Sequence, residues 1–296
     1  LEPFNWNSRF KSKSSLQYIK SEKAEAVYFA GQQVLAKELH YRPLISILVP
    51  VYQVNPRFLN EMIESVISQT YDNWQLCMVD DSSKRYNSEI KSIFKRYAEN
   101  DSRIIYRIRE ENGHICRATN DCLALAKGEY VALLDHDDLL TPDALYEVVQ
   151  AINKNDKLDI IYSDEDKVDE WGMFYNPYYK PDWSPHSLWS RMYVCHLTVY
   201  RKALVDSVNG FRIGFEGSQD YDLLLRCSER TSHIHHIPRV LYHWRSHTES
   251  TASSDNAKNY CSNAAFKAVK DTMLRRKLEA KIDFVGKNQS YLHVKP

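Results

Sequence analysis

The chain is poor in glycine, with only 8 glycines in 296 residues, and it lacks the glycine signatures of common nucleotide-binding folds. No GxxxxGK[ST] segment occurs, and no GxGxxG follows the first apolar run at residues 44–50. In both signatures the glycines let backbone amides approach and hold phosphate groups. Their absence argues against a P-loop ATPase and against a Rossmann dehydrogenase.

An excess of charge of either sign is also missing. Lys plus Arg equals Asp plus Glu, 39 each, so no global basic field gathers nucleic acid. The six cysteines form no CxxC pair, which suggests neither a zinc site nor a disulfide framework and favours a reducing compartment. No apolar run approaches the roughly 18 residues of a membrane span, and no signal peptide is visible.

What the chain does contain is a regular alternation of apolar strands and amphipathic helices. Expected strands cover residues 44–50, 74–79, 103–108, 130–134, 159–162, 195–200 and 240–244; expected helices cover residues 58–67, 90–97, 114–126, 145–152, 220–230 and 259–280. This alternation indicates βαβ units around a mostly parallel sheet, and hence an α/β fold flanked by helices.

Three segments depart from this rhythm. Residues 1–42 are polar with helical apolar spacing, which predicts a helical N-terminal extension. Residues 163–193 are aperiodic and rich in Trp, Tyr and Pro, which is more typical of a substrate-covering insertion than of simple packing. Residues 281–296 predict a short strand pair or a linker.

Acidic residues gather where two predicted strands end. Asp80 and Asp81 follow the second strand, and Asp135, Asp137 and Asp138 follow the fourth. Because the carboxyl ends of parallel strands meet at one rim, both clusters are expected to face one cleft. Carboxylates this close repel one another unless a cation joins them. Mn²⁺ or Mg²⁺ bound to a nucleoside diphosphate fits such a rim, since these ions combine few carboxylates with phosphate oxygens.

Several ordered motifs between about residues 43 and 255 resemble the family 2 glycosyltransferases, of the kind that build bacterial polysaccharides, with a GT-A fold. They are PLISILVPVY at 43–52, VDDSS at 79–83, NG at 112–113 with RATN at 117–120, GEY at 128–130, DHDD at 135–138 and QDYD at 219–222. Several motifs in order are far more specific than one DxD, which occurs often by chance. The resemblance implies a GT-A α/β domain, with the N-terminal extension and the C-terminal helix added to it.

The resemblance also implies roles for individual residues. The nucleotide-binding set it implies is Pro50, Val51, Tyr52, Asp81, Arg117, Asp135 and His136. In that set Val51 and Tyr52 line the base and Asp81 accepts a hydrogen bond from it. Asp137 is implied as the direct metal ligand, and His247 is similar to a late His that joins the metal or the diphosphate. Asp220 stands where the family places its catalytic base, here preceded by Gln219 rather than Glu.

Each of these residues has a simpler alternative reading. Asp81 can begin an Asx turn before two serines, and Asp220 can cap its helix. Arg117 can be a solvated helix residue. His247 can be an ordinary loop histidine, because the surrounding segment is rich in histidine.

The function expected is an inverting transferase that moves a sugar from a nucleotide diphosphate, UDP favoured and dTDP an alternative, to a hydroxyl of a saccharide or lipid-linked saccharide. A non-catalytic donor-binding or scaffold module of a larger polysaccharide synthase is the second reading. A nucleotidyltransferase is the third, but it would carry a basic glycine-rich loop where residues 53–56 read QVNP.

The expected organisation is a GT-A domain at 43–255, divided into a nucleotide-binding half (43–140) and an acceptor-binding half (141–255). A C-terminal helix and tail (256–296) follow, which can link to a further domain, and the start at Leu1 rather than Met predicts a piece of a longer protein. The expected location is the cytoplasm, with peripheral association at the inner membrane face left open.

Overall fold

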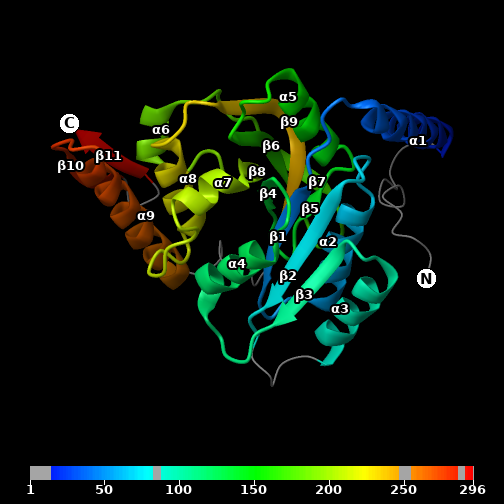
Figure 1. The fold of residues 1–296 in the computed structure, drawn as a ribbon, viewed down its shortest axis with the longest axis horizontal. Helices are drawn as coiled ribbons and strands as arrows, with labels where there is room; N and C mark the ends of the chain where they lie inside the picture. The colour runs from blue at the N-terminus through cyan, green and yellow to red at the C-terminus, as the bar shows by residue number, and fades with distance from the viewer. Residues whose placement is uncertain (1–14, 83–87, 247–254, 286–290, 296) are drawn as a thin grey trace.

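The computed structural model describes residues 15–82, 88–246, 255–285 and 291–295. Its centre is a curled sheet in which the first four strands of the chain lie together at one side (Figure 1). These strands run parallel in the order β3-β2-β1-β4. Their bounds are β1 (Ile45–Val51), β2 (Trp74–Asp80), β3 (Ile104–Ile108) and β4 (Tyr130–Leu133).

The other side of the sheet mixes strand directions. From β4 the order continues through β8, β6 and β9 to β5, while β7 pairs with β6. Only β6 and β9 are parallel here; the remaining pairs are antiparallel. The bounds are β5 (Leu139–Leu140), β6 (Ile160–Val168), β7 (Phe174–Tyr178), β8 (Thr198–Arg201) and β9 (Ile234–Arg245).

Helices cover both faces of the sheet, and the alternation of buried side chains along each strand explains why. In β1, Ile47 and Val49 belong to one core cluster and Leu48 to a second, as the two-residue period of a strand requires. Helices α2, α3 and α5 pack on the first cluster, and α4, α8 and α9 on the second. The helices are α1 (Ser15–Glu38), α2 (Pro56–Ile67), α3 (Ser88–Asn100), α4 (His114–Leu125), α5 (Ala144–Lys154), α6 (Pro185–Ser190), α7 (Lys202–Ser207), α8 (Gln219–Ser228) and α9 (Asp255–Arg275).

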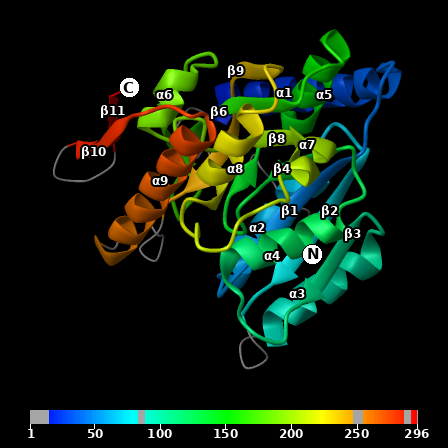
Figure 2. The ribbon, with the colours of Figure 1, turned by 60° about the vertical axis from the view of Figure 1, so that its left-hand side comes forward.

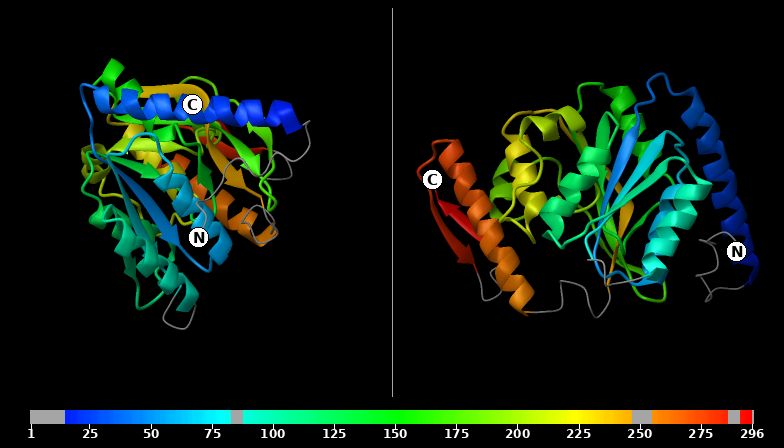
Figure 3. Two further views of the ribbon diagram at one scale, coloured as in Figure 1. Left: turned by 90° about the vertical axis from the view of Figure 1, so that its right-hand side faces the viewer. Right: turned by 60° about the horizontal axis from the view of Figure 1, so that its bottom comes forward.

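The two ends of the described chain lie at opposite ends of the molecule. Helix α1 runs along one end, and α9 with the antiparallel hairpin of β10 (Lys281–Val285) and β11 (Tyr291–Lys295) forms the other (Figure 3). Helix α9 lies beside α8 (Figure 2). The N-terminal helix, the C-terminal helix and the final strand pair thus agree with the sequence-based predictions. The division into domains at residues 42 and 255 stays a prediction.

The prediction for residues 163–193 was wrong at its start. Strand β6 continues to Val168 and carries Asp164 and Glu165, both buried. The acidic run reads as a loop in the sequence because buried carboxylates are costly without partners. Here each finds a basic partner: Asp164 accepts from His236, and Glu165 from Lys180.

Within the described ranges, none of the helices is both long enough and apolar enough to cross a membrane.

Candidate active site

Asp81, directly after β2, is held by the start of α4. It is only 2% exposed; its Oδ1 accepts from the backbone N–H of Gly113 at 2.8 Å and forms an ion pair with Arg109 Nε at 2.9 Å. Burial raises the pKa of Asp81, while Gly113 and Arg109 act in the opposite direction. The Asx-type turn is formed by Asp80, whose carboxylate accepts from Ser82 N at 2.9 Å. Asp81 therefore bridges two loops instead of forming that turn.

The other residues expected around a base lie at the same rim. Val51 ends β1 and is buried, and its carbonyl accepts from Asp81 N at 2.8 Å. The following Tyr52 is 48% exposed, which leaves its ring face accessible for stacking. Arg117 lies exposed in the first turn of α4, so its solvated alternative stays open.

The acidic loop after β4 is fixed by a buried arginine and a buried tyrosine from β9. Arg245, 0% exposed, donates from its backbone N to Asp138 Oδ1 at 2.6 Å and from Nε to the carbonyl of Asp137 at 2.6 Å. Tyr242 donates its hydroxyl to Asp138 Oδ2 at 2.5 Å. Burial raises the pKa of Asp138 well above its usual range, and the charges of Asp137 and Asp135 raise it further. The loop thus concentrates negative charge that a cation would relieve.

His136 and Asp137 occupy the turn of this loop. His136 Nδ1 lies 3.1 Å from the carbonyl oxygen of Pro50, which connects the acidic loop to the end of β1. Its Nε2 lies 4.0 Å from Asp137 Oδ1. The direct metal role of Asp137 stays a prediction.

A group able to hold a metal ion forms where the acidic loop meets the segment before β8. One ligand atom each from Asp135, Asp138 and His196 lies within 4.8 Å of the others. His196 Nε2 is 3.7 Å from Asp135 Oδ2. Burial works to lower the pKa of His196, but the neighbouring carboxylates of Glu165, Asp135 and Asp138 raise it to about 9. The sequence reading missed His196 because it lies in an apolar run 61 positions after Asp135, with no local motif to mark it.

Asp220 lies in the first turn of α8, after the cap residue Ser218. Burial raises its pKa; the charge of His196 lowers it, and that of Asp135 raises it. These mutual effects place Asp220 within electrostatic reach of the possible metal group. A raised pKa makes a carboxylate a stronger base once it is ionised.

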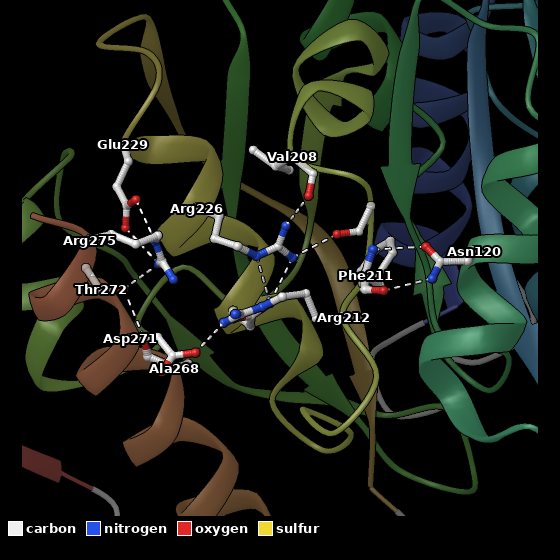
Figure 4. Close-up of polar contacts among 12 residues, drawn as sticks. Asn120, Val208, Phe211, Arg212, Arg226, Glu229, Ala268, Asp271, Thr272 and Arg275 are labelled. Atoms are coloured by element: carbon white, nitrogen blue, oxygen red, sulfur yellow. Dashed lines mark hydrogen bonds and ion pairs between the residues drawn. The ribbon is translucent and has the colours of Figure 1, made fainter.

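A polar network connects α8 to the segment before it and to α9 (Figure 4). Asp222, 0% exposed, accepts from Arg226 Nε at 2.9 Å and from Arg212 Nε at 3.1 Å. Arg212 also pairs with Asp271 of α9 at 3.0 Å, and Arg226 donates to the carbonyl of Val208 at 2.8 Å. The second acid of the QDYD motif thus anchors the helix that carries Asp220 in its first turn.

The aromatic residues of 163–193 divide into two groups. Trp183 and Trp189 pack against the second core cluster, as structural residues do. Trp171 and Tyr179 are 77% and 71% exposed. These two rings, together with Tyr175 at 43% exposed, are available to stack on a ligand.

His247 lies outside the described residues. The histidines before it are largely accounted for by pairing: His236 with Asp164 at 2.9 Å and His243 with Asp166 at 2.5 Å. The histidine-rich composition of this segment therefore reflects acid–imidazole pairs between β6 and β9.

A family model described as Glycosyl transferase family 2 matches residues 46–208, more than half of the chain. The chain belongs to this family. The match ends before α8, so it does not include Asp220. Family 2 membership confirms the resemblance seen in the ordered motifs.

Two relatives in bacteria extend the likeness beyond the matched segment. The chain is 38% identical over 253 residues to the O-antigen biosynthesis protein RfbC of Myxococcus xanthus, covering 86% of the chain and 20% of the relative. It is 26% identical over 249 residues to a chondroitin synthase of Escherichia coli, covering 84% of the chain and 35% of the relative. The chain thus spans a fifth to about a third of these relatives' length.

Solved structures of glycosyltransferases share the fold. S. aureus TarS 1–349 in complex with UDP-GlcNAc matches with a TM-score of 0.63 at 18% identity, covering 79% of this chain and 68% of that one. The mannosyltransferase PcManGT from Pyrobaculum calidifontis, in complex with GDP-Man and Mn²⁺, matches with a TM-score of 0.61 at 17% identity, covering 84% and 74%. The predicted GT-A α/β fold is confirmed.

Proposed function

We propose that this family 2 chain is an inverting, metal-dependent glycosyltransferase that moves a sugar from a nucleoside diphosphate to a hydroxyl of a saccharide acceptor. One observation carries the proposal: the group of Asp135, Asp138 and His196 lies within electrostatic reach of Asp220. The reaction needs a cation near the leaving diphosphate and a base near the attacking hydroxyl. In this proposal Asp135, Asp138 and His196 hold the cation and Asp220 is the base.

The donor atoms of this group fit a divalent cation. Two carboxylates and one imidazole suit Mn²⁺ well, whereas Mg²⁺ takes oxygen ligands almost exclusively. Asp137 and His247 remain the family-implied ligands beside these three. When bound, the cation neutralises charge that develops on the leaving diphosphate. Mn²⁺ is therefore the ion we propose first, with Mg²⁺ as the alternative.

The chain's own residues then bind, orient and deprotonate. Val51, Tyr52 and Asp81 hold the base, with uracil favoured because a carboxylate accepts from its N3–H and with thymine as an equivalent. Arg117, exposed in the first turn of α4, would meet a phosphate with its guanidinium. Asp220 takes the proton of the acceptor hydroxyl. A base on the face opposite the leaving group gives direct displacement with inversion.

The acceptor class follows from the relatives more than from the site. An O-antigen biosynthesis protein and a chondroitin synthase both assemble saccharide chains by name. The exposed Trp171 and Tyr179 suit the faces of sugar rings. We therefore propose a saccharide or lipid-linked saccharide acceptor.

The substitution Asp220→Asn tests the base. We expect donor binding to stay within about threefold, while sugar transfer falls by about 10²–10⁴-fold, the usual contribution of a general base. Isothermal titration with UDP and Mn²⁺ measures the first, and product formation from a panel of UDP- and dTDP-sugars the second. Turnover equal to that of the unmodified chain would remove Asp220 from this role.

The substitution Asp137→Ala tests the metal role that the family implies for this residue. We expect the Mn²⁺-dependent part of UDP affinity to be lost, with the metal-independent part kept. Titrations with and without a chelator separate the two. An unchanged Mn²⁺ dependence would remove Asp137 from this role and leave Asp135, Asp138 and His196 as the candidate ligands among the described residues.

The second candidate is a non-catalytic donor-binding module of a longer synthase. It is favoured by one fact: the relatives named above are roughly three to five times as long as the part that this chain matches. A module of this kind would bind UDP with Mn²⁺ but neither hydrolyse nor transfer any donor of the panel. Transfer or slow hydrolysis of one donor excludes it.

A further inference from the structure

The possible metal group has a second layer of residues with contacts to its members. Tyr242 of β9 contacts all three. Its hydroxyl donates to Asp138 Oδ2 at 2.5 Å, and the tyrosine hydroxyl oxygen accepts from the backbone N of Asp135 at 3.3 Å. Its ring stacks on His196, with ring centroids 4.7 Å apart and an interplanar angle of 15°. One rigid side chain therefore sets the spacing between two carboxylate-bearing residues and the imidazole.

Glu165 of β6 contacts the imidazole from the opposite side. Its Oε2 accepts from the backbone N of His196 at 3.0 Å and lies 3.4 Å from the ring Nδ1. Both ring nitrogens thus face carboxylates, Nδ1 toward Glu165 and Nε2 toward Asp135, although Nδ1 makes no hydrogen bond within the described residues. A cation bound at Nε2 would replace the proton on that nitrogen, and the remaining ring proton would then lie on Nδ1, facing Glu165. A carboxylate that orients a histidine in this way is the usual support of a metal-binding imidazole.

Lys180 completes this support. Its side chain is 0% exposed, its Nζ donates to Glu165 Oε2 at 3.0 Å, and it also contacts the carbonyl oxygen of His196. The lysine thus keeps the Glu165 carboxylate in place and holds the His196 backbone at the same time. A buried charged pair of this kind is costly unless it is well hydrogen-bonded, which it is here.

We propose that Tyr242 and Glu165 are positioning residues that preform a cation site in which His196 binds through Nε2. This inference rests on the proposed metal dependence. It adds what the family motifs do not give: an imidazole ligand far from the acidic loop in sequence, and the two side chains that aim it. The tyrosine sets the distance between ligands, and the glutamate selects the nitrogen that binds.

The main test compares two single-atom changes. Tyr242→Phe removes the hydroxyl and keeps the stacked ring; Tyr130→Phe removes a buried hydroxyl that bonds the carbonyl of Leu158 at 2.9 Å, on β4 and away from the acidic loop. Mn²⁺ affinity is measured by electron paramagnetic resonance titration of the full chain. We expect about a tenfold loss for Tyr242→Phe, the lower end of what such outer residues contribute, and no loss for Tyr130→Phe. Equal affinities for the two variants would overturn the role of Tyr242.

A second pair tests the glutamate. Glu165→Gln is compared with Asp166→Asn, which breaks the adjacent acid–imidazole pair with His243 on the same strand. We expect a 10–100-fold loss of Mn²⁺ affinity for the first variant only. Melting curves of both variants show whether a loss of affinity merely follows a loss of folding.

A measurement on the unmodified chain needs no variant to fold. In ¹⁵N-histidine spectra with UDP and Zn²⁺, a diamagnetic ion that binds imidazole, His196 should show a protonated Nδ1 and a metal-shifted Nε2. A protonated Nε2 would overturn the proposal. If the proposed metal-dependent function itself is wrong, the result is different: the unmodified chain would bind no Mn²⁺, with or without UDP.

Discussion

The two sides of the sheet solve the same packing problem with different chemistry. Strand β2, on the parallel side, is buried at all seven positions and is largely apolar. Strand β6, on the mixed side, is buried at most positions yet carries three successive acids. Each of these acids pairs with a histidine: Asp164 with His236, Glu165 with His196 and Asp166 with His243.

The difference shows what each side is built to do. Apolar burial on the parallel side stabilises the sheet and leaves ligand contacts to the loops at the strand ends. On the mixed side, charged groups lie inside the sheet itself, where the pairing that keeps them tolerable also fixes ligands. We expect the two sides to respond differently to mutation and to pH.

The largest effect is expected from Arg245→Met on the mixed side. Arg245 is 0% exposed, pairs with Glu61 at 2.7 Å and supports the acidic loop. Its removal leaves the buried Glu61 carboxylate with the half-exposed Arg57, 2.9 Å away, and takes the donor from the Asp137 carbonyl. Loss of one partner of a buried ion pair is strongly destabilising, so unfolding in urea should become easier by about 3–5 kcal/mol.

The matched control is the double change Arg245→Met with Glu61→Leu. It removes both charges and should recover much of the lost stability, because apolar replacement of a whole buried pair is often tolerated. A double variant no more stable than Arg245→Met would show that packing, not charge, dominates at this position.

A smaller effect is expected from Leu76→Ala on the parallel side. Leu76 is 0% exposed in β2 and belongs to the first core cluster. The cavity should lower the unfolding free energy by about 3 kcal/mol. Mn²⁺ affinity should not change, which calorimetry can verify; a parallel loss of affinity would contradict the division into two sides.

How far the sequence predicts the fold differs between these sides for the same reason. Strands β1 to β4 alternate with helices in an apolar rhythm, so their existence and order were predicted closely. The continuation of β6 through Asp164 and Glu165 was not, because acids inside a strand contradict β propensity until their partners are known. The two-residue strand β5 was also missed, since it is too short to show a period.

The candidate site divides in a similar way. Asp81, Asp135 and Asp220 belong to motifs: the first two follow β2 and β4, as the sequence predicts, and Asp220 lies in the first turn of α8. Their roles stay predictions. His196, Glu165 and Tyr242 belong to no motif and come together only through the pairing of β6, β8 and β9. Such contacts between residues distant in the chain are not visible in a single sequence.

A further effect concerns the acid limb of the stability profile, that is, the loss of unfolding free energy as the pH falls. Burial alone would raise the pKa of Glu165, but His196 and Lys180 lower it from 4.5 to about 2. A lowered carboxyl pKa adds stability that is complete above pH 4.5 and is lost as the pH falls toward 2. In the presence of a chelator, Glu165→Gln should flatten this limb in urea titrations between those two values. An unaltered limb would show that Glu165 does not carry the pH dependence.

The C-terminal hairpin has a practical consequence for anyone shortening this chain. Leu292 of β11 is buried in the second core cluster, and Ile282 and Phe284 of β10 pack against it. Arg191, after α6, donates to the hydroxyl of Tyr291 at 2.9 Å and to that of Tyr178 at 3.0 Å. A fragment that ends at residue 208, where the family match ends, or even after α9, would leave hydrophobic side chains of the second core cluster exposed to solvent. Such a fragment should precipitate on expression. Crystallisation and screening versions should keep every residue through Lys295.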